Sequence, residues 1–207
     1  MKKNKRKKII IISLICILLI VISLIIYLIQ NKDVNGKITK EKEVVSKIDK
    51  FDYYLESNAS KYYKETYKEL ESILSKEEVD YLEYSKLVSK LFLADVFTLD
   101  NKNISSDIGG IQFIYPTFEN DFRKIVQTTL YSSIETNFDG NRSQELPIVA
   151  NVDVPNVEEG TFNYNSTNIT SYNVDANVTY EKDLGYQTKF SLVLIKEKEK
   201  LYIAKLS

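Results

Sequence analysis

The chain contains no histidine and no tryptophan, and it has one cysteine and one methionine in 207 residues. Without histidine there is no Ser-His-Asp or Cys-His triad, and zinc sites or haem ligation built on histidine are excluded as well. The single cysteine, Cys16, lies inside an apolar stretch. It cannot form an intramolecular disulfide, so we expect any folded domain of this chain to depend on its core alone.

Glycine and proline are also scarce, with six and three residues. We find no Walker-type phosphate loop, and no Ser-x-x-Lys acylation motif after the apolar stretch. Paired carboxylates for glycoside hydrolysis need a defined separation, and no spacing among the 29 acidic residues singles out a pair. We therefore expect no catalytic residue and no cofactor.

The N-terminus has the pattern of a membrane anchor. A run without charged residues extends from Ile9 to Ile29, long enough at about 1.5 Å per residue to cross roughly 30 Å of hydrocarbon. It follows six basic residues that favour the cytoplasmic side: Lys2, Lys3, Lys5, Arg6, Lys7 and Lys8. The run is longer than the apolar part of a cleaved signal peptide and does not end at small residues.

This pattern predicts a basic cytoplasmic tail (1–8), a transmembrane helix (9–30), a polar tether (31–43) and an extracytoplasmic domain (44–207). The lipid bilayer is thus one expected partner. Subtracting the six basic residues of the tail leaves 22 basic against 29 acidic residues after the helix, a net charge of −7. Nucleic-acid binding calls for a basic surface, so we expect no nucleic-acid partner.

Apolar residues at helical spacing predict three helices within residues 44–99. The first presents Val44, Ile48, Phe51 and Leu55 on one face. The second ends near Leu74 and buries Tyr63, Tyr67, Leu70 and Leu74. Ser75-Lys76-Glu77-Glu78 has the capping-box pattern, which predicts that the third helix begins at Lys76. Its inward residues are Val79, Leu82, Leu87, Leu91 and Phe92.

The second half of the chain is predicted to be mainly strand. Residues 111–115 form a short β-like run before Pro116, and a helix is expected from Thr117 to about Ser133. Residues 171–180 alternate between apolar and polar, which indicates a strand with one buried face. Further strands are expected at Ile148–Val154, Thr188–Ile195 and Leu201–Leu206. The fold class is α+β.

This order of elements resembles the nuclear-transport-factor-2-like superfamily, in which helices pack on a bent antiparallel sheet to form a cone. With the anchor, the chain resembles inner-membrane scaffold proteins of type IV secretion and Gram-positive conjugation. The resemblance implies a non-enzymatic scaffold domain that binds other envelope proteins or itself, and it carries over no catalytic residue. A small-molecule or glycan-binding sensory module is the alternative, because the cone commonly encloses a pocket. An envelope hydrolase is a third hypothesis.

Two further patterns have more than one interpretation. Seven of the fifteen tyrosines lie between Tyr53 and Tyr84, where they suit half-buried helix faces or a partner-binding surface. The candidates for that surface, which lie off the apolar stripes, are Tyr53, Tyr62 and Tyr81. Oxygen-bearing side chains also alternate from Asn137 to Glu145, but glycine stands fourth rather than sixth as in a calcium loop. We expect a turn at Asp139-Gly140 and no metal site.

Overall fold

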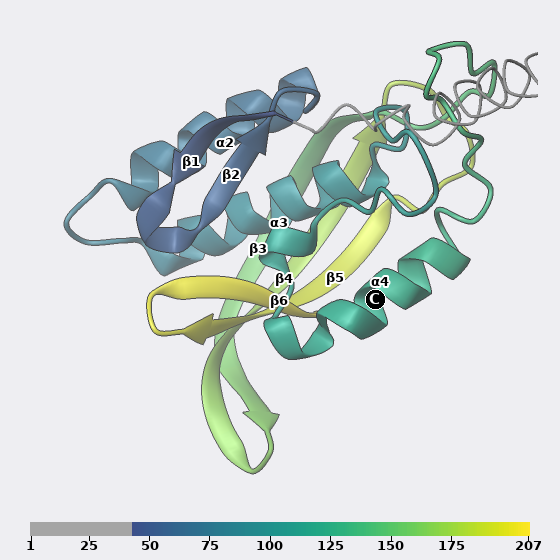
Figure 1. The fold of residues 1–207 in the computed structure, drawn as a ribbon. Coiled ribbons are helices and arrows are strands. Elements are labelled where there is room, and N and C mark those ends of the chain that lie inside the picture. The colour runs from purple at the N-terminus through teal and green to yellow at the C-terminus, as the bar shows by residue number, and fades with distance from the viewer. Residues whose placement is uncertain (1–42) are drawn as a thin grey trace, which may run out of the picture. The chain divides into compact units, whose positions relative to one another are not determined.

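The computed structural model describes residues 43–207, which form an α+β fold with three α-helices packed against a curved antiparallel sheet (Figure 1). The elements in chain order are β1 (Val44–Ile48), β2 (Tyr53–Glu56), α2 (Lys61–Leu74), α3 (Tyr81–Phe97), α4 (Glu119–Thr128), β3 (Val149–Tyr164), β4 (Thr167–Tyr180), β5 (Lys189–Glu197) and β6 (Lys200–Leu206). Short 3₁₀ segments occupy Asp49–Phe51, Ile111–Phe113 and Pro116–Phe118.

The predicted basic tail, transmembrane helix and most of the tether lie outside the described residues. Within residues 43–207, no helix is both long enough and apolar enough to cross a bilayer.

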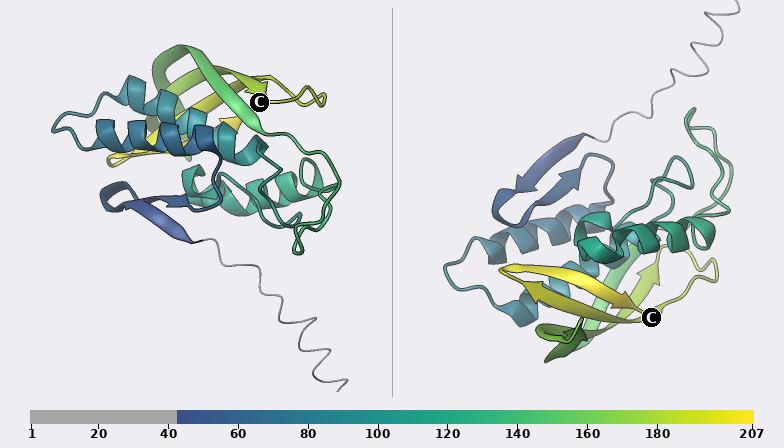
Figure 2. Two further views of the ribbon diagram at one scale, coloured as in Figure 1. Left: turned by 90° about the horizontal axis from the view of Figure 1, so that it is seen from above. Right: turned by 60° about the horizontal axis from the view of Figure 1, so that its bottom comes forward.

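The described residues build three layers. The strands β3-β4-β5-β6 form an antiparallel sheet in this order, and β1 pairs with β2 in a separate hairpin. Both views of Figure 2 show the helix pair α2 and α3 between this hairpin and the four-stranded sheet. Helix α4 lies beside β6, at one edge of the sheet (Figure 1).

Side chains of α3 fill the face of the sheet that the helices cover. Leu87, Leu91 and Phe92 are at most 1% exposed, and they belong to one core cluster with Val174 of β4 and Leu192 of β5. Burial of apolar area at this scale is the main stabilising term in a chain without disulfides. The face of the sheet that the helices cover is thus filled by the side chains of the core.

A closed ring of hydrogen bonds joins the three layers. The Tyr53 hydroxyl of β2 donates to the carbonyl of Leu201 in β6 at 2.8 Å, and the Leu201 N–H donates to the Tyr84 hydroxyl of α3 at 3.3 Å. The single hydroxyl proton of Tyr53 is used in the hydrogen bond to Leu201. In the 2.8 Å hydrogen bond between the Tyr53 and Tyr84 hydroxyls, Tyr84 is therefore the donor. Tyr53 is fully buried, so the prediction that it lies on an exposed surface is wrong.

The predicted first helix is also wrong, because residues 44–56 form the β1–β2 hairpin. Tyr53 and Leu55 are buried and two residues apart in β2, so Leu55 matches a strand as well as the predicted helical spacing, and Phe51 lies in the 3₁₀ turn between the strands. Asp52, immediately before β2, adopts a left-handed conformation (φ 51°). Packing against the helices therefore selected the strand spacing of two residues over the helical spacing of three and four.

Helix α3 begins at Tyr81 rather than Lys76. Asp80 caps it by accepting the N–H groups of Leu82 and Glu83 at 2.9 and 3.1 Å, whereas Ser75 closes the end of α2. Leu82, predicted to face inward, is 44% exposed.

Helix α4 is shorter than predicted. It ends at Thr128, because Thr129 leaves the helical region (φ −117°, ψ −88°).

The predicted strand at 111–115 is mostly a 3₁₀ turn. Only its end reaches the sheet, where Ile114 forms an isolated parallel bridge with Ile203 and the Tyr115 N–H donates to the Ile203 carbonyl at 3.0 Å.

The strand predicted at 148–154 is longer than expected and continues to Tyr164 as β3. Pro155 does not end it, because this residue lies at a bulge on an edge strand, where no ladder hydrogen bond is lost.

Three predictions are confirmed. Helix α2 buries Tyr63, Tyr67, Leu70 and Leu74, and its N-cap is Ser60. Strand β4 buries the predicted face, of which Tyr180 alone is half-exposed. The β5–β6 hairpin turns within the charged segment 196–200.

Candidate functional site

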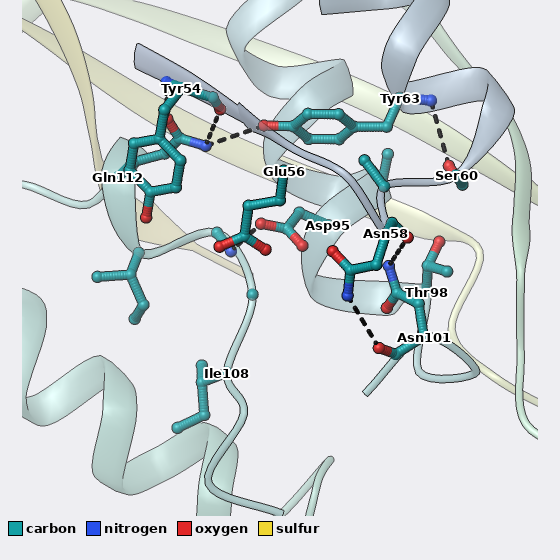
Figure 3. A pocket seen from close by; sticks show the side chains of 15 residues that line it. Tyr54, Glu56, Asn58, Ser60, Tyr63, Asp95, Thr98, Asn101, Ile108 and Gln112 are labelled. Atoms are coloured by element: carbon teal, nitrogen blue, oxygen red, sulfur yellow. Dashed lines mark hydrogen bonds between the residues drawn. The ribbon is translucent and has the colours of Figure 1, made fainter. Parts of the chain in front are cut away.

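Polar side chains from distant segments enclose a small pocket beside the start of α2. The polar pocket is about 40 Å³ in volume, and its main side chains are Tyr54, Glu56, Asn58, Tyr63, Asp95, Asn101 and Gln112 (Figure 3). They come from β2, the loop before α2, α2 itself, α3, and the segments after α3. This volume is enough for a water molecule or one small polar group.

Gln112 holds one wall of the pocket in place. Its side-chain oxygen accepts the Tyr54 N–H at 2.8 Å, and its amide nitrogen donates at 3.0 Å both to the Tyr54 carbonyl and to the Tyr63 hydroxyl. Burial raises the pKa of the Tyr63 hydroxyl well above its ordinary value, and the nearby carboxylate of Asp95 raises this pKa further. Tyr63 therefore stays protonated at physiological pH.

Asp95 is fixed at another wall by two strong hydrogen bonds. Its carboxylate accepts the Lys102 ammonium at 2.7 Å and the Gly110 N–H at 2.7 Å. The Lys102 side chain is 1% exposed, so this ion pair is buried on the lysine side. Both contacts hold the Asp95 carboxylate in a fixed orientation as a hydrogen-bond acceptor at this wall.

Two amide side chains of the pocket are only half satisfied. Asn58 donates to the Asn101 carbonyl and Asn101 donates to the Asn58 carbonyl, both at 3.3 Å. The side-chain oxygens of these residues are buried, and within residues 43–207 neither has a hydrogen-bond partner. A buried acceptor without a donor costs about 1–3 kcal/mol, so the two oxygens mark where a donor belongs.

The pocket floor depends on a close backbone approach. A Cβ atom at Gly109 would lie 2.3 Å from the Asp95 carbonyl oxygen, which is backbone and cannot rotate away. We expect Gly109→Ala to lower the free energy of unfolding by about 2 kcal/mol through this overlap, measured by urea denaturation. Gly140→Ala is the control, since the added Cβ would meet no atom within 4 Å. The only strain on alanine there comes from the left-handed φ of 71°. Equal losses in both variants would contradict the close approach.

A second hollow is apolar and open. The α4–β6 groove, about 330 Å³ in volume, separates α4 from the edge strand β6 and also contains Asp121 and Lys205. Its apolar residues are Ile114, Phe118, Phe122, Ile125, Val126, Ile203, Ala204 and Leu206. Ile125 is 61% exposed, although its neighbour Val126 is buried.

Neither hollow contains Tyr81, and Tyr62 lies beside an open cleft next to the polar pocket. The Tyr62 hydroxyl accepts the Val152 N–H at 3.0 Å and donates to the Val152 carbonyl at 3.2 Å, so it occupies the free edge of β3 as a strand partner would. Tyr81 stacks on Tyr172, and the Lys196 ammonium lies 3.6 Å from its ring centroid. Partner binding by Tyr62 and Tyr81 stays a prediction.

The alternating oxygen residues 137–145 form a turn in the structure. The Asn137 side chain accepts the Arg142 N–H at 3.0 Å, and Glu145 pairs with Lys182 at 2.6 Å. Gly140 has the positive φ expected for a turn at Asp139-Gly140. Among the described residues, no cluster of three or more histidine, cysteine or acidic side chains is arranged to hold a metal ion.

Sequence reasoning missed most of the polar pocket. Asn58 and Asn101 have only the sequence signals of helix boundaries, and Asp95 and Gln112 have no distinctive spacing. The nearest signal was the Gly109-Gly110 pair, which marks a tight backbone approach.

Comparison of the chain with protein-family models, curated proteins and solved structures finds no match in any of the three.

Proposed function

We propose that this chain is a single-pass membrane protein whose residues 44–207 form a non-enzymatic, extracytoplasmic interaction domain of a bacterial envelope assembly. The cationic and apolar N-terminus supports the membrane location. The observation that carries the proposal is the α4–β6 groove, which is an open apolar surface. The helix-covered face of the sheet, by contrast, is already occupied by core side chains. Exposed apolar patches of this kind mark interaction sites.

The expected occupant of the groove is an extended apolar segment of another envelope protein. Ser207 exchanges two backbone hydrogen bonds with Ser191 of β5, at 2.8 and 3.0 Å. Because antiparallel residues alternate, the N–H and C=O of Leu206 point away from β5 toward the open edge. An added strand pairs with these groups, and its side chains pack on Ile125 and Phe122.

Replacing Ile125 with aspartate tests the groove. We expect Ile125→Asp to reduce partner recovery at least about tenfold, because a charge replaces an apolar contact worth about 1.5–3 kcal/mol. The measurement is quantitative mass spectrometry of proteins crosslinked to the full-length chain in its own membranes. Since Ile125 is exposed, the free energy of unfolding should change by less than about 0.5 kcal/mol.

Val45→Asp is the matched control, because Val45 is also an exposed apolar residue but lies on β1, outside the groove. If Val45→Asp and Ile125→Asp reduce recovery equally, or if Ile125→Asp has no effect, the groove is not the docking site.

A small-molecule binding module is the second candidate function. Tyrosines and acids together line the polar pocket, with Tyr54 and Tyr63 beside Glu56 and Asp95. A few convergent polar groups in an enclosed pocket are typical of ligand sites. This function does not depend on the groove.

A further inference from the structure

We propose that the polar pocket binds the ammonium group of a small primary amine, which donates hydrogen bonds to Asn58 Oδ1 and Asn101 Oδ1. This assignment rests on the second candidate function and is independent of the α4–β6 groove.

The unmatched groups of the pocket are acceptors. Several nearby donors are already used: Gly110 N–H and Lys102 bond Asp95, and the Gln112 amide bonds Tyr54 and Tyr63. What is left without a partner in the described part of the chain is the pair of buried amide oxygens. A ligand that satisfies both must therefore be a donor, which an anion is not.

The charge of the surroundings favours a single positive charge. The two charged side chains that line the pocket, Glu56 and Asp95, are both acidic. The Lys102 ammonium, 2.7 Å from Asp95 Oδ1, opposes a divalent ion at the same carboxylate. An acidic lining favours a monovalent ammonium over a neutral donor, and charge-assisted hydrogen bonds from its N–H groups are the stronger kind.

The size of the pocket limits the ligand to a small head group. About 40 Å³ holds one ammonium group but not a sugar ring or an aromatic base. Ala59 and Ala94 line the same pocket and provide apolar surface for the first methylene groups. The open cleft next to it, about 450 Å³, shares Asn58 and Asn101 as wall residues and gives room for the rest of a longer amine.

Calorimetric titration of the full-length protein in detergent micelles with n-butylammonium tests the assignment. We expect a dissociation constant on the order of 1 mM for so small a ligand. n-Butanol has the same alkyl chain without the charge, and tetramethylammonium has the charge without N–H donors; both should bind at least about tenfold more weakly.

Two variants locate the binding. Asn58→Ala removes one acceptor and should weaken n-butylammonium at least about tenfold. Glu56→Gln keeps the side-chain shape, removes the charge and should weaken the amine by about tenfold without affecting n-butanol. Asn168→Ala, an exposed site on β4, is the control and should leave binding unchanged.

Equal binding of n-butanol or tetramethylammonium would overturn the amine assignment while leaving a small-molecule pocket. No binding of any probe up to roughly 50 mM would overturn both the assignment and the second candidate function. Binding that neither pocket variant alters would place the amine elsewhere on the protein and overturn the assignment as well.

Discussion

Replacing Lys102 with methionine is expected to lower the free energy of unfolding by about 3 kcal/mol. The Lys102 side chain is 1% exposed and its ammonium lies 2.7 Å from Asp95 Oδ1. Methionine fills a similar volume but removes the Lys102 ammonium from Asp95, and removing one partner of a buried ion pair costs about 3–5 kcal/mol. The lower end applies because Asp95 is 23% exposed and keeps its bond to the Gly110 N–H.

Urea denaturation followed by circular dichroism measures this loss, and Lys182→Met is the matched control. The Lys182–Glu145 pair is as short, at 2.6 Å, but its side chains are 67% and 64% exposed, so the control should lose less than about 0.5 kcal/mol. In Lys102→Met/Asp95→Asn the Asp95 charge is also removed, and we expect part of the stability to return. Similar losses for Lys102→Met and Lys182→Met would show that the buried pair is energetically equivalent to a surface pair.

Raising the pH from about 8 to about 11 is expected to remove about 6 kcal/mol of stability, through four buried tyrosines. Burial raises the pKa of Tyr53, Tyr63 and Tyr84 well above its ordinary value, and it raises the pKa of Tyr67 to about 12. In the unfolded chain these hydroxyls ionise near pH 10, so the stability they contribute is complete below about pH 10 and is lost above it. Each contributes about 1.4 kcal/mol of the loss at pH 11.

Urea unfolding at a series of pH values measures the slope, and ultraviolet absorbance of tyrosinate reports ionisation on unfolding. Tyr84→Phe is a useful comparison, because it removes one titrating group from the ring formed with Tyr53 and Leu201. Its stability should fall with pH by about 1.4 kcal/mol less per unit above pH 10 than that of the natural chain. A stability that is flat from pH 9 to about 11 would contradict the buried, protonated state of these hydroxyls.

In the elements that sequence reasoning predicted correctly, the apolar residues repeat at a single spacing, and one face of the element is buried. Helix α2 repeats Tyr63, Tyr67, Leu70 and Leu74 at a spacing that no strand shares, and β4 alternates over ten residues. In both, the local chain geometry fixes which side chains point the same way, so the pattern in the sequence is sufficient.

Residues 44–56 show why such reasoning fails elsewhere. Val44, Ile48, Phe51 and Leu55 suit a helix at spacings of three and four, whereas in the structure Tyr53 and Leu55 are buried on one face of strand β2. The choice was made by packing against α3, where the Tyr53 hydroxyl joins Tyr84. The same packing buried a tyrosine that the sequence alone placed on the surface.

The candidate site was decided almost entirely by tertiary structure. Asn58 and Asn101 are 43 residues apart, yet each donates to the other's carbonyl, and Gln112 pairs with Tyr54 across 58 residues. Sequence by itself determined the residue chemistry that is absent, the anchor-like N-terminus, the α+β class and the elements with a single clear period. The polar pocket and the α4–β6 groove arose only in the folded chain, because periodicity records which face of a segment is buried and not which distant segment covers it.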